Sequence, residues 1–151
     1  MKKAITLTIL FALVFAVIPA AASTPLAVTI DSTMDTDTGT GTFVAYGPAV
    51  DAGLFCRSGT ASDYVPLATG WQSNIRVNLR VFKTLVCDDG SGEIFMDIKV
   101  RIVYSASETL SNWVIKNGDG EYTRLHGEGQ ITATGADNLV FDHYTGLMHQ
   151  D

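Results

Sequence analysis

The sequence has few basic residues, and this shortage narrows the classes of partner open to it. Lys and Arg number 10 against 16 Asp and Glu, which gives a formal net charge of −6 at pH 7. Nucleic acids and anionic membranes are bound by clustered cations, so the balance opposes both as partners. The basic residues that are present include a central group, for which a solvated strand face is favoured over an anion-binding site: Arg76, Arg80, Lys99 and Arg101.

Recognisable catalytic and metal-binding motifs are also missing. His126, His143 and His149 have no metal-ligand spacing, and no glycine loop is followed by Lys and then Ser or Thr. The residues therefore nominate no catalytic set, no metal and no cofactor. Two acidic groups resemble parts of a calcium loop, but each is interpreted as a solvated turn because the full ligand pattern is absent: Asp35 with Asp37, and Asp88 with Asp89 and Glu93.

The chain has one long apolar run without a charge, and it lies at the N-terminus. Lys2 and Lys3 precede residues 4–18, which carry no charge, and Pro19 and the alanines up to Ala22 follow. This three-part pattern is typical of a secretory signal peptide that is cleaved near Ala22. The alternative, a membrane anchor, is less favoured because a spanning helix needs about 18–20 apolar residues.

We therefore predict a signal peptide over residues 1–22 and a single domain over residues 23–151. The signal directs the domain out of the cytoplasm, so a periplasmic or secreted protein is expected. No membrane attachment is expected after cleavage.

Only two cysteines occur, Cys56 and Cys87, and both lie in the predicted domain. An even number of cysteines in an exported chain favours a disulfide over a zinc site or a reactive thiol. No Cys-x-x-Cys pair and no nearby histidine supports zinc. A bridge between them closes a loop of about 30 residues, which in the chain-entropy model stabilises the fold by about 3–4 kcal/mol.

The predicted domain shows no helical spacing of its apolar residues. Apolar and polar residues alternate instead, with a period of two. Apolar residues fall on odd positions over residues 75–85, with Phe82 and Lys83 as imperfections, and on even positions over 94–104, with a glycine-rich turn at 88–92 between them. The pattern predicts a β-hairpin with one buried face. Its two apolar faces coincide only if paired residues have an odd index sum.

Shorter β-rich segments flank this hairpin, while residues 31–41 are predicted to form a loop because they lack an apolar period. About eight strands result, which favours an all-β, eight-stranded antiparallel barrel of the calycin-like kind, with a β-sandwich as the alternative. The predicted short strands are residues 26–30, 41–46, 53–60, 112–116, 131–134 and 139–145.

Large apolar side chains are the remaining candidates for a site. A small barrel either fills its interior with side chains or holds one ligand there. Packing in the core is favoured for these residues, and lining a ligand cavity is the alternative: Phe95, Met96, Tyr104, Trp113, Tyr122 and Phe141.

One glycine-rich segment resembles a signature of the allene oxide cyclase and dirigent barrels. Residues 113–129 contain the pattern Gly-x-Gly-x-aromatic-x-x-Leu-x-Gly-x-Gly, which begins at Gly118 and ends at Gly129. Gly41-x-Phe43 and residues 144–146 are similar to further parts of that family. The resemblance implies an eight-stranded antiparallel barrel with an apolar cavity. Barrels of this family often assemble, so a homo-oligomer is one form that the resemblance allows.

The resemblance also suggests functions. One plant branch cyclises an unstable fatty-acid epoxide, and another steers the coupling of phenolic radicals. We expect an exported barrel that binds a small apolar or phenolic molecule. The alternatives are a cyclase or isomerase that holds a reactive substrate in one conformation, and a non-catalytic interaction module of the cell envelope.

Overall fold

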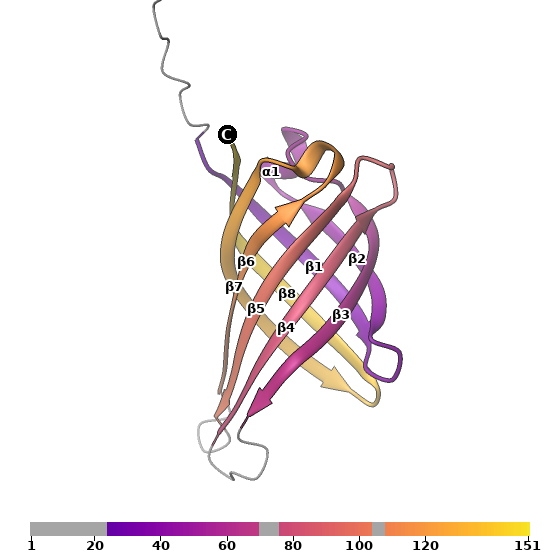
Figure 1. Ribbon diagram of the computed structural model, residues 1–151, viewed down its shortest axis with the longest axis vertical. Coiled ribbons are helices and arrows are strands. Elements are labelled where there is room, and N and C mark those ends of the chain that lie inside the picture. Colours follow the sequence, from indigo (N-terminus) through magenta and orange to yellow (C-terminus); the bar gives the residue numbers. More distant parts are fainter. Residues whose placement is uncertain (1–23, 70–75, 104–107) are drawn as a thin grey trace, which may run out of the picture.

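The computed structural model describes residues 24–69, 76–103 and 108–151, so the predicted signal peptide and Tyr104 lie outside the described residues. Eight antiparallel strands form one closed barrel in which each strand pairs with the next and the first pairs with the last (Figure 1). The predicted barrel is confirmed, and the sandwich alternative does not apply. The strands are β1 (Leu26–Asp35), β2 (Thr40–Tyr46), β3 (Ser58–Thr69), β4 (Arg76–Cys87), β5 (Glu93–Val103), β6 (Glu108–Gly118), β7 (Leu125–Ala136) and β8 (Leu139–Gln150).

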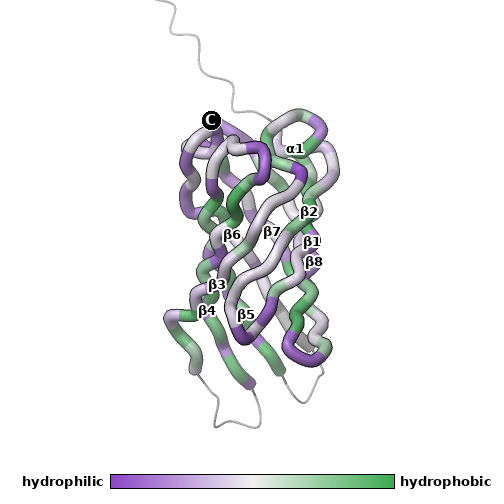
Figure 2. The backbone as a smooth tube through the Cα atoms, turned by 90° about the vertical axis from the view of Figure 1, so that its right-hand side faces the viewer, coloured by the Kyte–Doolittle hydropathy of each residue, from purple (hydrophilic) through white to green (hydrophobic). Residues whose placement is uncertain are grey.

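The predicted central hairpin is formed by β4 and β5. Val81 pairs with Ile98, and their indices sum to 179, an odd number that the other pairs of this hairpin share. This register places the apolar residues of both strands on the inner face, where Leu85 and Ile94 are fully buried. The alternation of hydrophobic and hydrophilic residues can be followed along the strands in Figure 2.

The loop predicted over residues 31–41 is wrong. β1 continues to Asp35 and β2 begins at Thr40, so only a short turn separates them. Ile30, Ser32 and Met34 are buried in alternation, which is the period of a half-buried strand. The polar Ser32 at an inward position conceals this period in the sequence.

The strand predicted over residues 53–60 is largely wrong, because β3 begins only at Ser58 and continues to Thr69. Before it lies a one-turn helix, α1 (Pro48–Asp51), whose proline stands in the first turn, where a missing N–H costs nothing. A single turn has no detectable helical period. A second short helix, η1 (Gly120–Tyr122), joins β6 to β7.

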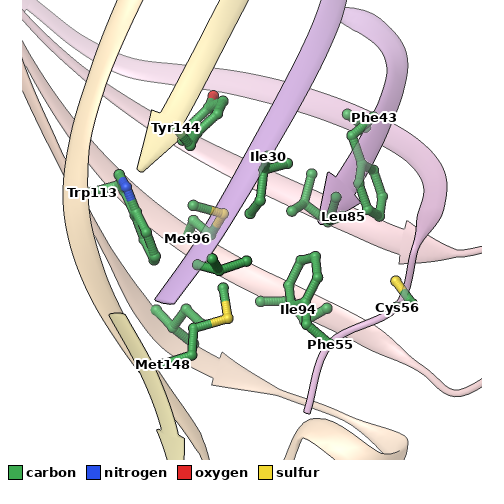
Figure 3. Close-up of a cluster of buried hydrophobic side chains, with 14 of the residues drawn as sticks. Ile30, Phe43, Phe55, Cys56, Leu85, Ile94, Met96, Trp113, Tyr144 and Met148 are labelled. Atoms are coloured by element: carbon green, nitrogen blue, oxygen red, sulfur yellow. The ribbon is translucent and has the colours of Figure 1, made fainter. Parts of the chain in front are cut away.

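The α1 end of the barrel is filled with side chains (Figure 3). Phe55, from the segment after α1, packs in tilted contacts with two other rings, 6.0 Å from Phe43 and 6.2 Å from Tyr122 between ring centroids. The predicted disulfide between Cys56 and Cys87 is confirmed, and it fastens this segment to the end of β4. Buried apolar packing and a covalent link therefore close one end of the barrel.

Candidate functional site

The opposite end of the barrel is hollow. A cavity of about 580 Å³ lies inside it, near the turns that join β1 to β2 and β7 to β8. Small ligands are usually held in concave, mainly apolar sites of this size. Its apolar wall includes these inward-facing residues of β4, β5, β7 and β8: Leu79, Val81, Ile98, Val100, Ile131 and Val140.

A buried lysine stands on the inner wall of this cavity. The Lys83 side chain is 1% exposed, and its Nζ lies 2.9 Å from Oδ1 of Asp63 and donates a hydrogen bond of 3.2 Å to Oδ2. Nζ also lies 3.5 Å from Oδ2 of Asp142. A buried ammonium is tolerated only when it is paired in this way, because removing its hydration is costly.

Asp142 is itself held by two hydroxyl groups. Oδ2 accepts hydrogen bonds from Ser32 Oγ at 3.3 Å and from the Tyr144 hydroxyl at 3.0 Å. The Tyr144 ring belongs to the buried apolar cluster, and its hydroxyl points out of that cluster (Figure 3). Four strands thus supply a cluster of polar side chains on the inner wall, which we call the polar floor: Ser32, Asp63, Lys83, Asp142 and Tyr144.

The polar floor carries two carboxylates and one ammonium. Burial raises the pKa of Asp63, and the neighbouring Asp142 adds to this effect, although Lys83 opposes both. Burial also raises the pKa of Tyr144 well above its usual value. Oδ1 of Asp63 is buried and accepts no hydrogen bond from a described residue, but it lies 2.9 Å from Nζ of Lys83. The ion pair therefore engages this oxygen, and burial keeps it from contact with a ligand in the cavity.

The aromatic and sulfur-containing side chains nominated from the sequence lie elsewhere. Met96 and Trp113 are buried in the core, and Tyr122 is buried at the closed end beside the disulfide. Phe95 and Phe141 occupy positions of outward parity, and Phe141 is 43% exposed. None of these five residues lines the hollow end of the barrel.

Sequence reasoning missed the polar floor. Lys83 was treated as an imperfection in the alternating strand, yet it stands at an odd, inward position of β4 between Val81 and Leu85. A charge at a position of buried parity is the signal that could have drawn attention to it. Asp63 and Asp142 carry no comparable signal, because β3 was predicted to end before Asp63 and the strand pairing was unknown.

The acidic turns behave as turns in the described part of the chain. Asp35 Oδ1 accepts hydrogen bonds from the backbone N–H of Asp37 and Thr38. Asp89 Oδ1 accepts one from the N–H of Ser91. Across residues 24–69, 76–103 and 108–151, no group of three or more His, Cys, Asp or Glu is placed to hold a metal ion.

No protein-family model matches the chain, and neither a curated protein nor a solved structure matches it. Within the described residues, no helix has the length and apolarity needed to cross a membrane. The polar floor and the cavity above it therefore carry the argument for function.

Proposed function

We propose that this protein is an exported barrel that binds a small, largely apolar molecule in the hollow end of its lumen. The observation that carries the proposal is the cavity of about 580 Å³, whose walls are apolar and whose inner wall bears a buried, charged group. A pocket with mainly apolar lining and a few placed polar groups is the usual form of a small-molecule site. The signal-like N-terminus and the disulfide support export.

The polar floor indicates which head group the ligand carries. One ammonium faces two carboxylates, so a ligand carboxylate would meet an excess of like charge in a poorly solvated site. A hydroxyl group avoids this repulsion because it is uncharged, and it can donate a hydrogen bond to a carboxylate of the cavity wall. A phenol or an alcohol on an apolar body therefore fits better than a fatty acid.

A second candidate function, a cyclase or isomerase, is favoured by the same floor. Asp63 has a raised pKa and faces the cavity, which suits a carboxyl group that accepts and returns a proton. The apolar walls would hold a reactive substrate in one conformation. The resemblance of the glycine-rich segment to the allene oxide cyclase and dirigent barrels supports both candidates and stays a proposal.

The first test is native mass spectrometry of the protein purified from an exporting host. We expect the mass of a mature chain that begins near Ser23, together with a small apolar adduct that is released by collisional activation. Binding is then measured by displacement of an environment-sensitive apolar dye. An alkylphenol should displace the dye at least about tenfold more effectively than a fatty acid of equal length, because one charge-assisted contact changes affinity by about this factor.

A matched pair of variants locates the site. Val100→Phe places extra volume in the cavity and should abolish dye binding, whereas Val44→Phe enlarges a residue that is 57% exposed on the outer wall and should leave it unchanged. If neither the dye nor any alkylphenol binds to the wild-type protein, the binding proposal fails. Conversion of an added epoxide by the wild type, lost in Asp63→Asn, would favour the enzyme instead.

A further inference from the structure

A second concave surface involves the outward-facing residues of β3 to β7, and it shares four lining residues with the cavity in the lumen: Leu79, Val100, Ser111 and Ile131. A cavity of about 730 Å³ lies over β3 to β7, and another of about 570 Å³ lies over β5 to β8. Both are lined by Lys99, Asn112 and Gln130, so the two cavities adjoin each other at these residues. We call the two adjoining cavities the outer furrow.

The half of the outer furrow over β4 and β5 is cationic. Arg80, Lys99 and Arg101 line it, and among the described residues no Asp or Glu does so. The register of the hairpin explains this concentration, because Arg80 pairs directly with Lys99, and Arg101 stands two residues further along β5. Like charges placed opposite each other destabilise a sheet, so this arrangement needs a compensating role.

Only one of these three cations is neutralised within the described part of the chain. Arg80 donates two hydrogen bonds to the buried carboxylate of Asp97, at 3.0 and 2.7 Å. Lys99 and Arg101 are exposed and make no hydrogen bond or ion pair with any described residue. Lys99 and Arg101 therefore project from a concave surface of a chain whose net charge is −6. The hydrogen bonds from Arg80 lower the pKa of Asp97, and Lys99 is close enough to that carboxyl group for its charge to add to this effect.

Neutral hydrogen-bonding groups complete the lining. The amides of Asn78, Asn112 and Gln130 each offer both donors and acceptors beside the cations. This combination matches a ligand that carries both anionic groups and many hydroxyls.

We propose that the outer furrow binds an acidic polysaccharide, whose carboxylate or sulfate groups pair with Lys99 and Arg101 and whose hydroxyls contact the three amides. The cationic cavity extends across five strands, β3 to β7, which suits an extended chain. Lys99 and Arg101 do not line the lumen cavity, so a variant of these two residues tests this proposal and not the first one.

The test uses the full exported protein and three probes: polygalacturonate, dextran sulfate and neutral dextran. The wild type should bind the two acidic polymers and not the neutral one, with an affinity that falls as salt rises. Lys99→Gln/Arg101→Gln should weaken binding by at least about tenfold, since each lost charge-assisted contact contributes appreciably. The matched control is Arg57→Gln/Arg124→Gln, which changes the net charge equally at exposed residues that line no part of the furrow.

Two further measurements separate this partner from others. Asn112→Ala/Gln130→Ala should weaken binding of polygalacturonate more than that of inorganic polyphosphate, because only the sugar presents hydroxyls. The proposal is overturned if the wild type binds no acidic polysaccharide at low salt, or if the control variant loses as much affinity as the furrow variant. Tighter binding of polyphosphate, single-stranded DNA or anionic vesicles than of polygalacturonate would also overturn it. Circular dichroism of each variant verifies that the barrel remains folded.

Discussion

The indole of Trp113 packs directly against the backbone of Gly146. A Cβ atom added to Gly146 would stand 2.5 Å from Cζ2 of the indole and would also collide with the backbone oxygen of Glu128. Gly129 makes a similar approach on the neighbouring strand, where an added Cβ would stand 2.7 Å from Nε1 of Trp113. The indole Nε1 in turn donates to the backbone oxygen of Thr145 at 3.3 Å. These two glycines make room for the largest side chain of the core.

Gly146→Ala should therefore be strongly destabilising. The added methyl group meets backbone on one side and a buried ring on the other, and overpacking of this kind costs about 1–3 kcal/mol or more. Gly135→Ala is the matched control, because the nearest atom to its added Cβ is 3.8 Å away. Urea unfolding of both variants checks the prediction, and a Gly146→Ala variant as stable as Gly135→Ala would contradict it.

Lys83→Met should destabilise the protein at neutral pH by about 3–5 kcal/mol, because it leaves two carboxylates in a buried site without their cation. At about pH 4 the loss should be smaller, since protonation of Asp63, whose folded pKa is already raised, removes one of the unpaired charges. Unfolding at the two pH values measures this difference.

The double variant Lys83→Met/Asp63→Asn provides the control. It removes one carboxylate together with the ammonium, so it should be more stable than Lys83→Met alone at neutral pH. An equal loss in both variants would mean that packing of the lysine stem, rather than charge pairing, stabilises the floor.

The disulfide should contribute a large share of the stability. Cys56→Ser/Cys87→Ser opens a loop whose ends are 31 residues apart, for which the chain-entropy model gives about 3–4 kcal/mol. The segment after α1 should loosen first, because this link fastens it to β4. Hydrogen exchange of residues 53–57 and thermal unfolding, each with and without reductant, measure the two effects. Unchanged exchange there after reduction would show that the contacts of Phe55 suffice.

Much of the fold can be predicted from the alternation of apolar and polar residues and from the glycine-rich turns in the sequence. Strict alternation over β4 and β5 predicts their hairpin and the parity of its register, because only one parity buries both apolar faces. The limits of β1 and β3 could not be predicted in the same way. Ser32 and Asp63 stand at inward positions, so polar side chains interrupt the apolar period where the strand continues.

The candidate site could not be predicted for a related reason. The polar floor joins residues from β1, β3, β4 and β8, and only the barrel's closure brings β8 beside β1. Within one strand, Lys83 is an isolated exception to a pattern. Of the residues nominated instead, Met96, Trp113 and Tyr122 belong to the buried core, since large apolar side chains are usually core.

The ion pair between Arg80 and Asp97 on the outer wall should make the stability of the protein depend on pH in acid. Hydrogen bonds from Arg80 hold the pKa of Asp97 below its ordinary value of 3.8, although burial opposes them. A carboxyl group with a lowered folded pKa stabilises the fold above its unfolded pKa, and this contribution is lost as the pH falls through the folded value. Asp97 therefore adds stability above about pH 4 that disappears in stronger acid.

Asp97→Asn should reduce the stability at pH 7 and flatten its decline below about pH 4. The reduction should be about 1–2 kcal/mol, since the guanidinium of Arg80 is 44% exposed and partly solvated. Asp37→Asn is the matched control, because Asp37 is exposed and its carboxylate forms no ion pair with a described residue. Urea unfolding from pH 2 to 7 compares the three proteins. If Asp97→Asn has the same acid profile as the wild type, the carboxylate is not the group whose protonation weakens the outer wall.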